Sequence, residues 1–290
     1  MHAVTKSARQ QLHIIRTYPV ATVVALGSSL CVLYCGHLTH HSGHAIAYLI
    51  AVWLCAFATD IVVYHRPSPF IGFPIRHSSA QESAVILACT LLGQVFLYFR
   101  FSDLWDAMHG VPKLALITLI VFTYPIFLAV IYIFLYRYKP GELGINLRYW
   151  YLPLLIHLLW GSIAVTTAKE TIIWHDYIEQ NGIVGTLITG IICAALAEEF
   201  TRMLLQTRLS ALFQDQGMGF VTATLLWVCI HIPSSYPHTK DGKVILLYFI
   251  KLATLVPHGL LWGYITQRTK SLLPAVLVHG LNFWGLQNSF

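Results

Sequence analysis

The amino-acid sequence predicts an all-α protein, a polytopic transmembrane bundle of about eight to nine helices. Of its 290 residues, 57% are hydrophobic and only 10% are charged, and its mean hydropathy is +0.66. Soluble domains carry about 25% charged residues. So few charges cannot cover a folded surface in water. Apolar runs of roughly 15–24 residues also recur along the chain, and each is about long enough to cross a bilayer.

These runs are separated by short polar turns and predict nine helices. The predicted helices cover residues 18–37, 44–65, 82–100, 113–137, 150–168, 183–207, 219–232, 243–267 and 272–287. The seventh and the ninth are short for a spanning helix, which favours a tilted or half-buried position.

The basic residues of the loops predict that the N-terminus is cytoplasmic. Cytoplasmic loops carry an excess of Lys and Arg. On this topology the inner loops hold eleven and the outer loops five. The inner set is Lys6, Arg9, Arg16, Arg66, Arg76, Arg137, Lys139, Arg148, Arg208, Arg268 and Lys270, and the outer set is Arg100, Lys113, Lys169, Lys240 and Lys243. Because the net charge of +6 is scattered over loops, it indicates a lipid bilayer as partner and no nucleic acid.

Two adjacent carboxylates, Glu198 and Glu199, lie in an apolar run over residues 190–206, with Arg202 one turn later. An ionised carboxylate at the centre of a membrane helix costs roughly 2.5–3.5 kcal/mol. Such groups face a protein interior or a water-filled cavity, and they commonly serve in chemistry or ion movement. Both carboxylates are within helical reach of Arg202, at spacings of four and three residues. A structural ion pair is the simpler alternative.

Two other predicted helices carry polar groups at helical spacing. His231 follows Trp227 by four residues, and Pro233 ends that helix. His279 and Asn282 are three residues apart and are predicted to share one face of the last helix. The three helices together therefore offer two carboxylates, two imidazoles and an amide.

These groups suit cleavage of an amide bond by water. One of the two glutamates would take a proton from water, and His231 would orient or share that proton. His279 and Asn282 would donate hydrogen bonds to the oxyanion, at roughly 2.7–4 kcal/mol per donor. Arg202 would hold one carboxylate ionised and fixed. No cofactor is needed for this chemistry.

A metal site is the second interpretation of the same groups. Two histidines and one glutamate form a zinc ligand set with an open fourth position. Glu198 or Glu199 with His231 and His279 would supply that set. The residue types alone leave both mechanisms open.

The chain resembles the CAAX-processing and bacteriocin-immunity family (Abi, CPBP) of glutamic-type intramembrane endopeptidases. That family carries a double Glu followed by Arg, then an aromatic residue four before a His, then a His followed by Asn or Asp. The matching stretches here are AEEFTR, WVCIH and HGLN, and KPGELGINLRYW resembles the segment that opens the family core. The resemblance covers about residues 141–285. It implies a peptidase that acts on a membrane-associated or lipidated substrate. It divides the chain into N-terminal transmembrane helices, residues 1–140, and a protease-like core, residues 141–290.

The resemblance implies Glu198, Glu199, Arg202, His231, His279 and Asn282 as the site residues. Two spacings are one residue shorter than in the family, between the Glu pair and Arg202 and between His279 and Asn282. If Arg202 is kept in register, Ala197 takes the position of the first Glu and the chain is a silent relative. If the Glu pair is kept in register, Glu198 is the base and Glu199 pairs with Arg202. We favour the second alignment.

Two further interpretations remain beside the protease. A catalytically silent immunity or scaffolding relative would keep the fold without the chemistry. A transporter or proton-relay protein would string its polar groups along a path across the bilayer, whereas a protease brings them to one cavity. Lys251 and His258 lie on the predicted eighth helix. Lys251 is expected to extend its charged end toward the membrane surface. For His258, a functional role and a structural role are equally favoured.

A separate group of histidines lies in the predicted outer loop after the first helix. It comprises His37, His40, His41 and His44 in the pattern H-x-x-H-H-x-x-H. One such box offers too few ligands for a membrane di-iron centre, so we expect no metal there. The chain contains neither the H-E-x-x-H motif of zinc proteases nor the G-x-S-x-G motif of serine hydrolases.

Overall fold

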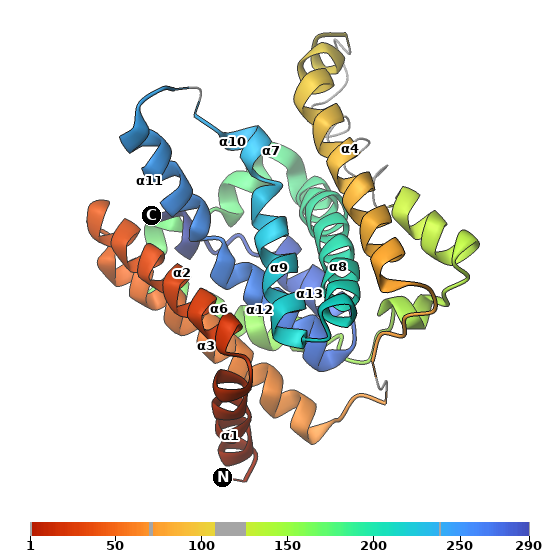
Figure 1. Ribbon diagram of the computed structural model, residues 1–290. Helices are drawn as coiled ribbons and strands as arrows, with labels where there is room; N and C mark the ends of the chain where they lie inside the picture. Colours follow the sequence, from red (N-terminus) through yellow and green to blue (C-terminus); the bar gives the residue numbers. More distant parts are fainter. Residues whose placement is uncertain (1, 70–71, 108–125, 238, 290) are drawn as a thin grey trace.

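The computed structural model describes residues 2–69, 72–107, 126–237 and 239–289, and within these ranges it contains helices and turns but no strand (Figure 1). The prediction of an all-α bundle is confirmed. Four apolar helical segments are long enough to cross a membrane, by length and composition: Pro19–Leu38, Ser42–His65, Trp174–Phe213 and Gly242–Thr269.

The N-terminal helices are α1 (His2–Thr17), α2 (Pro19–Leu38), α3 (Ser42–His65) and α4 (Ser79–Ala107). The second and third match the predicted helices 18–37 and 44–65 closely, and α4 extends the predicted helix 82–100 at both ends. Helix α1 was not predicted. Its basic and apolar residues alternate at helical spacing, so it is too polar to be found as an apolar run.

Most of the predicted helix 113–137 lies outside the described residues. Its described end includes a π-helical turn, η1 (Ile131–Leu135). The later elements follow in the order α6 (Leu152–Thr167), α7 (Trp174–Leu187), the π-helical η4 (Ile188–Leu196), α8 (Ala197–Phe213), α9 (Gln216–Cys229), α10 (Ile232–Ser235), α11 (Gly242–Ala253), α12 (Val256–Thr269) and α13 (Leu273–Gly280).

Two of the predicted helices are shorter or broken in the structure. The predicted helix 243–267 is divided into α11 and α12. Pro257, at the start of α12, has no N–H to donate to the preceding turn, so a continuous helix is interrupted there. The predicted helix 272–287 ends at Gly280 instead, and Gly285 adopts a positive φ of 73° in the turn that follows.

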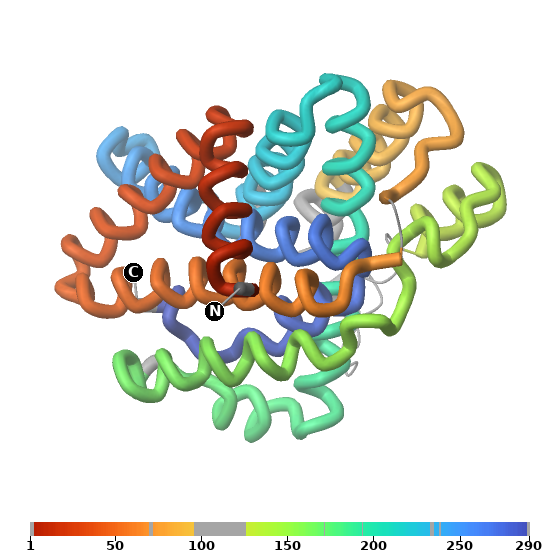
Figure 2. Tube along the Cα trace, turned by 90° about the horizontal axis from the view of Figure 1, so that it is seen from below, coloured from red at the N-terminus to blue at the C-terminus, as the bar shows by residue number. Residues whose placement is uncertain are grey.

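Helix α12 lies in the middle of the bundle. It packs against α3, α8, α9 and α13, while α8 and α9 form an antiparallel pair beside it. Figure 2 shows α3 and α6 side by side across one face of the molecule, and these two helices are in direct contact. This arrangement brings the N-terminal helix α3 against the same helix, α12, that the polar segments of α8 and α13 contact.

A buried ion pair joins α4 to α8. Arg208 Nε donates to Glu82 Oε2 at 2.7 Å, and both side chains are fully buried. The Tyr138 hydroxyl donates to the other oxygen of Glu82 at 2.6 Å. With both carboxylate oxygens hydrogen-bonded, the pair fixes the position of α8 relative to the N-terminal helices.

Candidate functional site

The glutamate pair begins α8 directly after the π-helical segment η4. Hydrogen bonds in a π-helix run from i to i+5, so the wider turns rotate the residues that follow relative to a continuous α-helix. The two carboxylates emerge in different surroundings. The Glu199 side chain is fully buried, whereas 22% of the Glu198 side chain is exposed.

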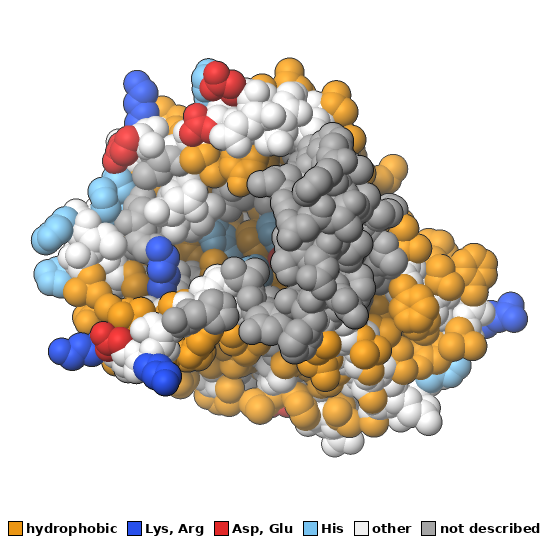
Figure 3. Space-filling model, turned by 90° about the horizontal axis from the view of Figure 1, so that it is seen from above, with side chains coloured by type: hydrophobic (Ala, Val, Ile, Leu, Met, Phe, Trp, Pro, Cys, Tyr) orange, Lys and Arg blue, Asp and Glu red, His pale blue; other side chains and the backbone are white. Residues whose placement is uncertain are grey.

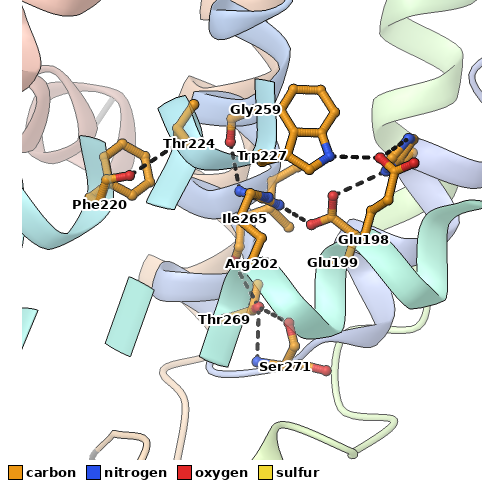
Figure 4. A network of polar contacts seen from close by, with 11 residues as sticks. Glu198, Glu199, Arg202, Phe220, Thr224, Trp227, Gly259, Ile265, Thr269 and Ser271 are labelled. Carbon is orange, nitrogen blue, oxygen red and sulfur yellow. Dashed lines mark hydrogen bonds and ion pairs between the residues drawn. The ribbon is translucent and has the colours of Figure 1, made fainter. Parts of the chain in front are cut away.

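Glu199 is held by Arg202. The Arg202 guanidinium contacts Glu199 through Nη2 and donates through Nη1 to the Gly259 carbonyl on α12 at 2.6 Å. Figure 4 shows Arg202 between these two partners. The Arg202 side chain is 1% exposed. A buried ion pair is stable only when good geometry and further hydrogen bonds offset its desolvation, and the Gly259 carbonyl supplies one of them.

His279 lies between the two glutamates. Its Nδ1 is 3.0 Å from Glu199 Oε1, and its Nε2 is 3.8 Å from Glu198 Oε2. The imidazole stacks on Trp262 of α12 with ring centroids 3.8 Å apart and planes 10° apart. The hydrogen bond to Glu199 and the stack on Trp262 fix the orientation of the His279 ring.

Glu198 has a different partner. Trp227 Nε1 donates to Glu198 Oε2 at 2.6 Å, as Figure 4 shows. Within the described residues, Oε1 of Glu198 makes no hydrogen bond. This oxygen therefore combines partial exposure with an unused lone pair, which a proton acceptor requires.

His231 follows Trp227 by one helical turn and packs against its indole edge-on, with ring centroids 4.9 Å apart. His231 Nδ1 is 3.1 Å from the Trp227 carbonyl. Because a carbonyl oxygen only accepts hydrogen bonds, Nδ1 carries the proton, and in the neutral ring the lone pair is on Nε2. Trp227 thus contacts both His231 and Glu198.

The predicted shared helical face of His279 and Asn282 is wrong. Helix α13 ends at Gly280, and Asn282 lies in the turn after it. The backbone N–H of Asn282 donates to the His279 carbonyl at 3.1 Å, and its side chain contacts His258 on α12, with Nδ2 3.1 Å from Nε2. A glycine at the last helical position ends α13 before the periodicity reaches Asn282.

A hollow opens on the face seen in Figure 3, with histidine side chains visible at its floor. The residues of the predicted site come from α8, from α9 and the turn after it, and from the end of α13 and the turn after it. Six residues were expected to meet at one site, and close contacts join four of them: Glu198, Glu199, Arg202 and His279.

Within the described ranges, no three or more His, Cys, Asp and Glu side chains form a group that could hold a metal ion. In the histidine group of the α2–α3 turn, His41 and His44 stack with centroids 5.0 Å apart, and His44 Nε2 is 3.2 Å from Glu170. Lys251 on α11 is exposed.

Three residues of the site were given no role from the sequence. They are Trp262 under His279, Gly259 at Arg202, and Tyr48, whose hydroxyl contacts His258 Nδ1 at 3.0 Å. A sequence signal exists for Trp262, because it follows His258 by four residues and so shares its helical face. No signal marks Tyr48, which lies 210 residues from His258 in the chain.

The sequence was compared with models of known protein families to find which family carries this group of polar residues. The sequence model of the family described as type II CAAX prenyl endopeptidase Rce1-like matches residues 180–284. Residues 180–284 thus match the CAAX protease family. The resemblance drawn from AEEFTR, WVCIH and HGLN is confirmed over this segment. No curated protein and no solved structure matches the chain.

All six predicted site residues fall within the CAAX protease segment, and Tyr48 and Glu82 fall outside it. The match to this family indicates a peptidase, and with the four apolar helical segments it indicates an integral membrane protein. The matched segment begins at residue 180, so the part of the expected core over residues 141–179, and the division at residue 140, stay predictions.

Proposed function

We propose that the protein is an intramembrane endopeptidase of the glutamic type, with Glu198 as the general base. The observation that carries this proposal is the unequal environment of the two glutamates. Arg202 neutralises Glu199, and Glu199 in turn anchors His279. Glu198 remains partly exposed, 3.8 Å from His279 Nε2, with Oε1 unused among the described contacts.

The separation of Glu198 and His279 leaves room for a nucleophilic water. A distance of 3.8 Å is too long for a direct hydrogen bond, and a water beside both groups can contact each at ordinary hydrogen-bond length. Glu198 would take a proton from this water as the water oxygen attacks the carbonyl carbon of the substrate. The same proton would then pass to the leaving amine nitrogen as the C–N bond breaks.

The negative charge that develops on the carbonyl oxygen needs donors. His279 donates Nδ1–H to the Glu199 carboxylate, so it can present Nε2–H to the oxyanion only as the imidazolium, in which both ring nitrogens are donors. Asn282 can present one hydrogen of Nδ2, since only the other is directed to His258. Each such donor contributes about 2.7–4 kcal/mol to stabilising the transition state. His231, with its lone pair on Nε2, would orient the water or share its proton.

The substrate proposed is a membrane-associated or lipidated peptide or protein, because α8, which carries both glutamates, and α12, whose Gly259 carbonyl binds Arg202, belong to segments long enough to cross a membrane. The clustering of polar groups at one place on α8, α9 and α13 favours this function over a transporter, whose polar groups would follow a path across the bilayer. A partly exposed, unused carboxylate oxygen also favours it over a silent relative.

The test uses the full chain in proteoliposomes with a farnesylated C-terminal peptide that carries a fluorophore and a quencher, and the same peptide without the lipid. Glu198→Gln is expected to reduce cleavage by about 10²–10⁴-fold, since the general base is lost. Glu170→Gln, an exposed glutamate outside the site, is the matched control. Equal rates of cleavage by the wild type, Glu198→Gln and Glu199→Gln would contradict the proposal.

A chelator separates the two mechanisms that the residue types left open. The glutamic mechanism expects cleavage to be unchanged after treatment with EDTA and dialysis. Loss of cleavage that zinc restores would instead favour the metal-dependent version with Glu198 or Glu199, His231 and His279 as ligands.

A further inference from the structure

A chain of three hydrogen bonds runs from the site to α3, outside the CAAX protease segment. Asn282 Nδ2 is 3.1 Å from His258 Nε2, and His258 Nδ1 is 3.0 Å from the Tyr48 hydroxyl. That hydroxyl is also 3.1 Å from the Thr254 carbonyl at the break between α11 and α12. Tyr48 is fully buried and His258 is 2% exposed, so no solvent competes for these contacts.

The carbonyl at the end of the chain fixes the direction of every bond. Because the Thr254 carbonyl only accepts, the single hydroxyl proton of Tyr48 is donated to it. The Tyr48 oxygen then accepts from His258, so Nδ1 carries the proton and Nε2 of the neutral ring is an acceptor. The amide of Asn282 must therefore turn Nδ2, and not Oδ1, toward His258.

The His258 ring is also held by stacking. Trp160 of α6 stacks on it with centroids 5.1 Å apart and planes 25° apart, and Trp262 stacks with centroids 5.0 Å and planes 22° apart. Trp262 also stacks on His279. The ring that orients Asn282 and the ring of His279 are thus packed against the same indole.

The orientation of the amide leaves Oδ1 of Asn282 buried and, among the described residues, without a hydrogen-bond partner. A buried acceptor with no partner requires an explanation in a native structure, and a ligand that supplies the donor is one. In a peptidase the matching donor is a backbone N–H of the bound peptide. One hydrogen of Nδ2 remains for the oxyanion.

We propose that Tyr48 and His258 are positioning residues that fix the amide of Asn282, so that Oδ1 accepts a hydrogen bond from a peptide N–H of the substrate. The proposal rests on the proposed function. It gives the N-terminal helix α3 a part in the site: Tyr48 acts on the substrate only through His258 and Asn282.

The test compares Tyr48→Phe, His258→Leu and His258→Gln in the peptide cleavage assay, with Tyr34→Phe on α2, an exposed tyrosine, as control. Tyr48→Phe and His258→Leu are expected to lower kcat/KM by about 10–100-fold, since misplacement of a contacting group costs up to about 10²-fold. His258→Gln keeps an acceptor for Nδ2 of Asn282, so it is expected to recover part of the loss. A wild-type kcat/KM in both Tyr48→Phe and His258→Leu, while the wild type cleaves the peptide, overturns this proposal and leaves the proposed function standing.

A second measurement does not depend on cleavage. In protein labelled with ¹⁵N-histidine, one neutral ring protonated at Nδ1 is expected to disappear in His258→Gln and to change tautomer or exchange in Tyr48→Phe. If the signal lost in His258→Gln is instead that of an Nε2-protonated ring, the hydrogen-bond directions are wrong and the proposal falls. Absence of cleavage by the wild type with the expected tautomer present would count against the proposed function and not against the hydrogen-bond chain.

Discussion

At the scale of single residues, the site separates two chemically identical side chains. Glu198 and Glu199 are neighbours in the chain, yet one is partly exposed beside Trp227 and the other is fully buried against Arg202. Both could reach Arg202 along a helix, at spacings of four and three residues. The three-residue pair forms, and this frees Glu198 for contact with Trp227 and His279.

Removal of Arg202 alone is expected to destabilise the protein strongly. Arg202→Met leaves Glu199 buried with its charge uncompensated, which costs about 3–5 kcal/mol. The double variant Glu199→Gln/Arg202→Met carries no buried charge at this place and is expected to lose less than Arg202→Met. The apparent unfolding temperature in detergent micelles, followed by tryptophan fluorescence, gives the order of the variants. A double variant that unfolds below Arg202→Met would contradict the ion-pair interpretation.

At the scale of elements, a close approach between two segments positions the site. Segment η4 and helix α13 meet at a pair of glycines, Gly190 and Gly280. A Cβ on Gly280 would lie 2.6 Å from the Gly190 carbonyl oxygen and 2.7 Å from the Cα of Ile191. Because His279 precedes Gly280, this contact sets the depth at which its imidazole reaches the glutamates.

Gly280→Ala is therefore expected to be destabilising. The methyl group meets backbone atoms that cannot rotate away, and overpacking of this kind costs about 1–3 kcal/mol. Gly27→Ala on α2 is the matched control, because a Cβ there meets nothing within 4 Å and alanine favours the helix by about 1 kcal/mol. Thermal unfolding of the two variants measures the difference. Similar unfolding temperatures for both would show that η4 and α13 are not in close contact.

The buried ion pair Arg208–Glu82 joins α8 to α4, whereas the more exposed ion pair Arg76–Glu142 joins the segment before α4 to the segment after η1. Glu82→Gln is expected to cost about 3–5 kcal/mol, because Arg208 would be left buried and unpaired. Glu142→Gln breaks the pair with Arg76, in which the two side chains are 24% and 39% exposed, and is expected to cost no more than about 1 kcal/mol. Chemical unfolding of both variants tests this ranking, and equal losses would refute it.

At the scale of the whole molecule, the segments that hold the inner and outer basic residues gather at opposite ends. In Figure 1, α1, the C-terminal end of α3 and the α8–α9 connection lie toward the lower end, and the α10–α11 connection lies toward the upper end. The first group carries residues of the inner set and the last carries residues of the outer set. The predicted topology requires this separation, and the cytoplasmic N-terminus stays a prediction.

The orientation has a direct test. A single cysteine introduced between Arg66 and Arg76, in a background without the native cysteines, is expected to resist a membrane-impermeant maleimide in intact cells and to react after permeabilisation. A cysteine placed between Lys240 and Lys243 is the control and is expected to react in intact cells. Labelling of the first site from outside would reverse the topology.

The sequence by itself determined the all-α membrane class, the family segment and the residue types of the candidate site. Hydropathy finds apolar helices because each one must be long enough to cross the bilayer, and buried charge stands out against that background. The motifs of residues 180–284 then select the peptidase family. These are local properties, and neighbouring residues suffice to detect them.

Only the tertiary structure decided which groups meet. Helical spacing allowed Arg202 to pair with either glutamate; the family resemblance favoured Glu199, and the structure contains that pair. The end of α13 at Gly280 turned Asn282 away from the face of His279 and toward His258, and α3 placed Tyr48 behind that ring. Contacts between residues so far apart in the chain depend on how whole helices pack, so no local pattern of the sequence could have specified them.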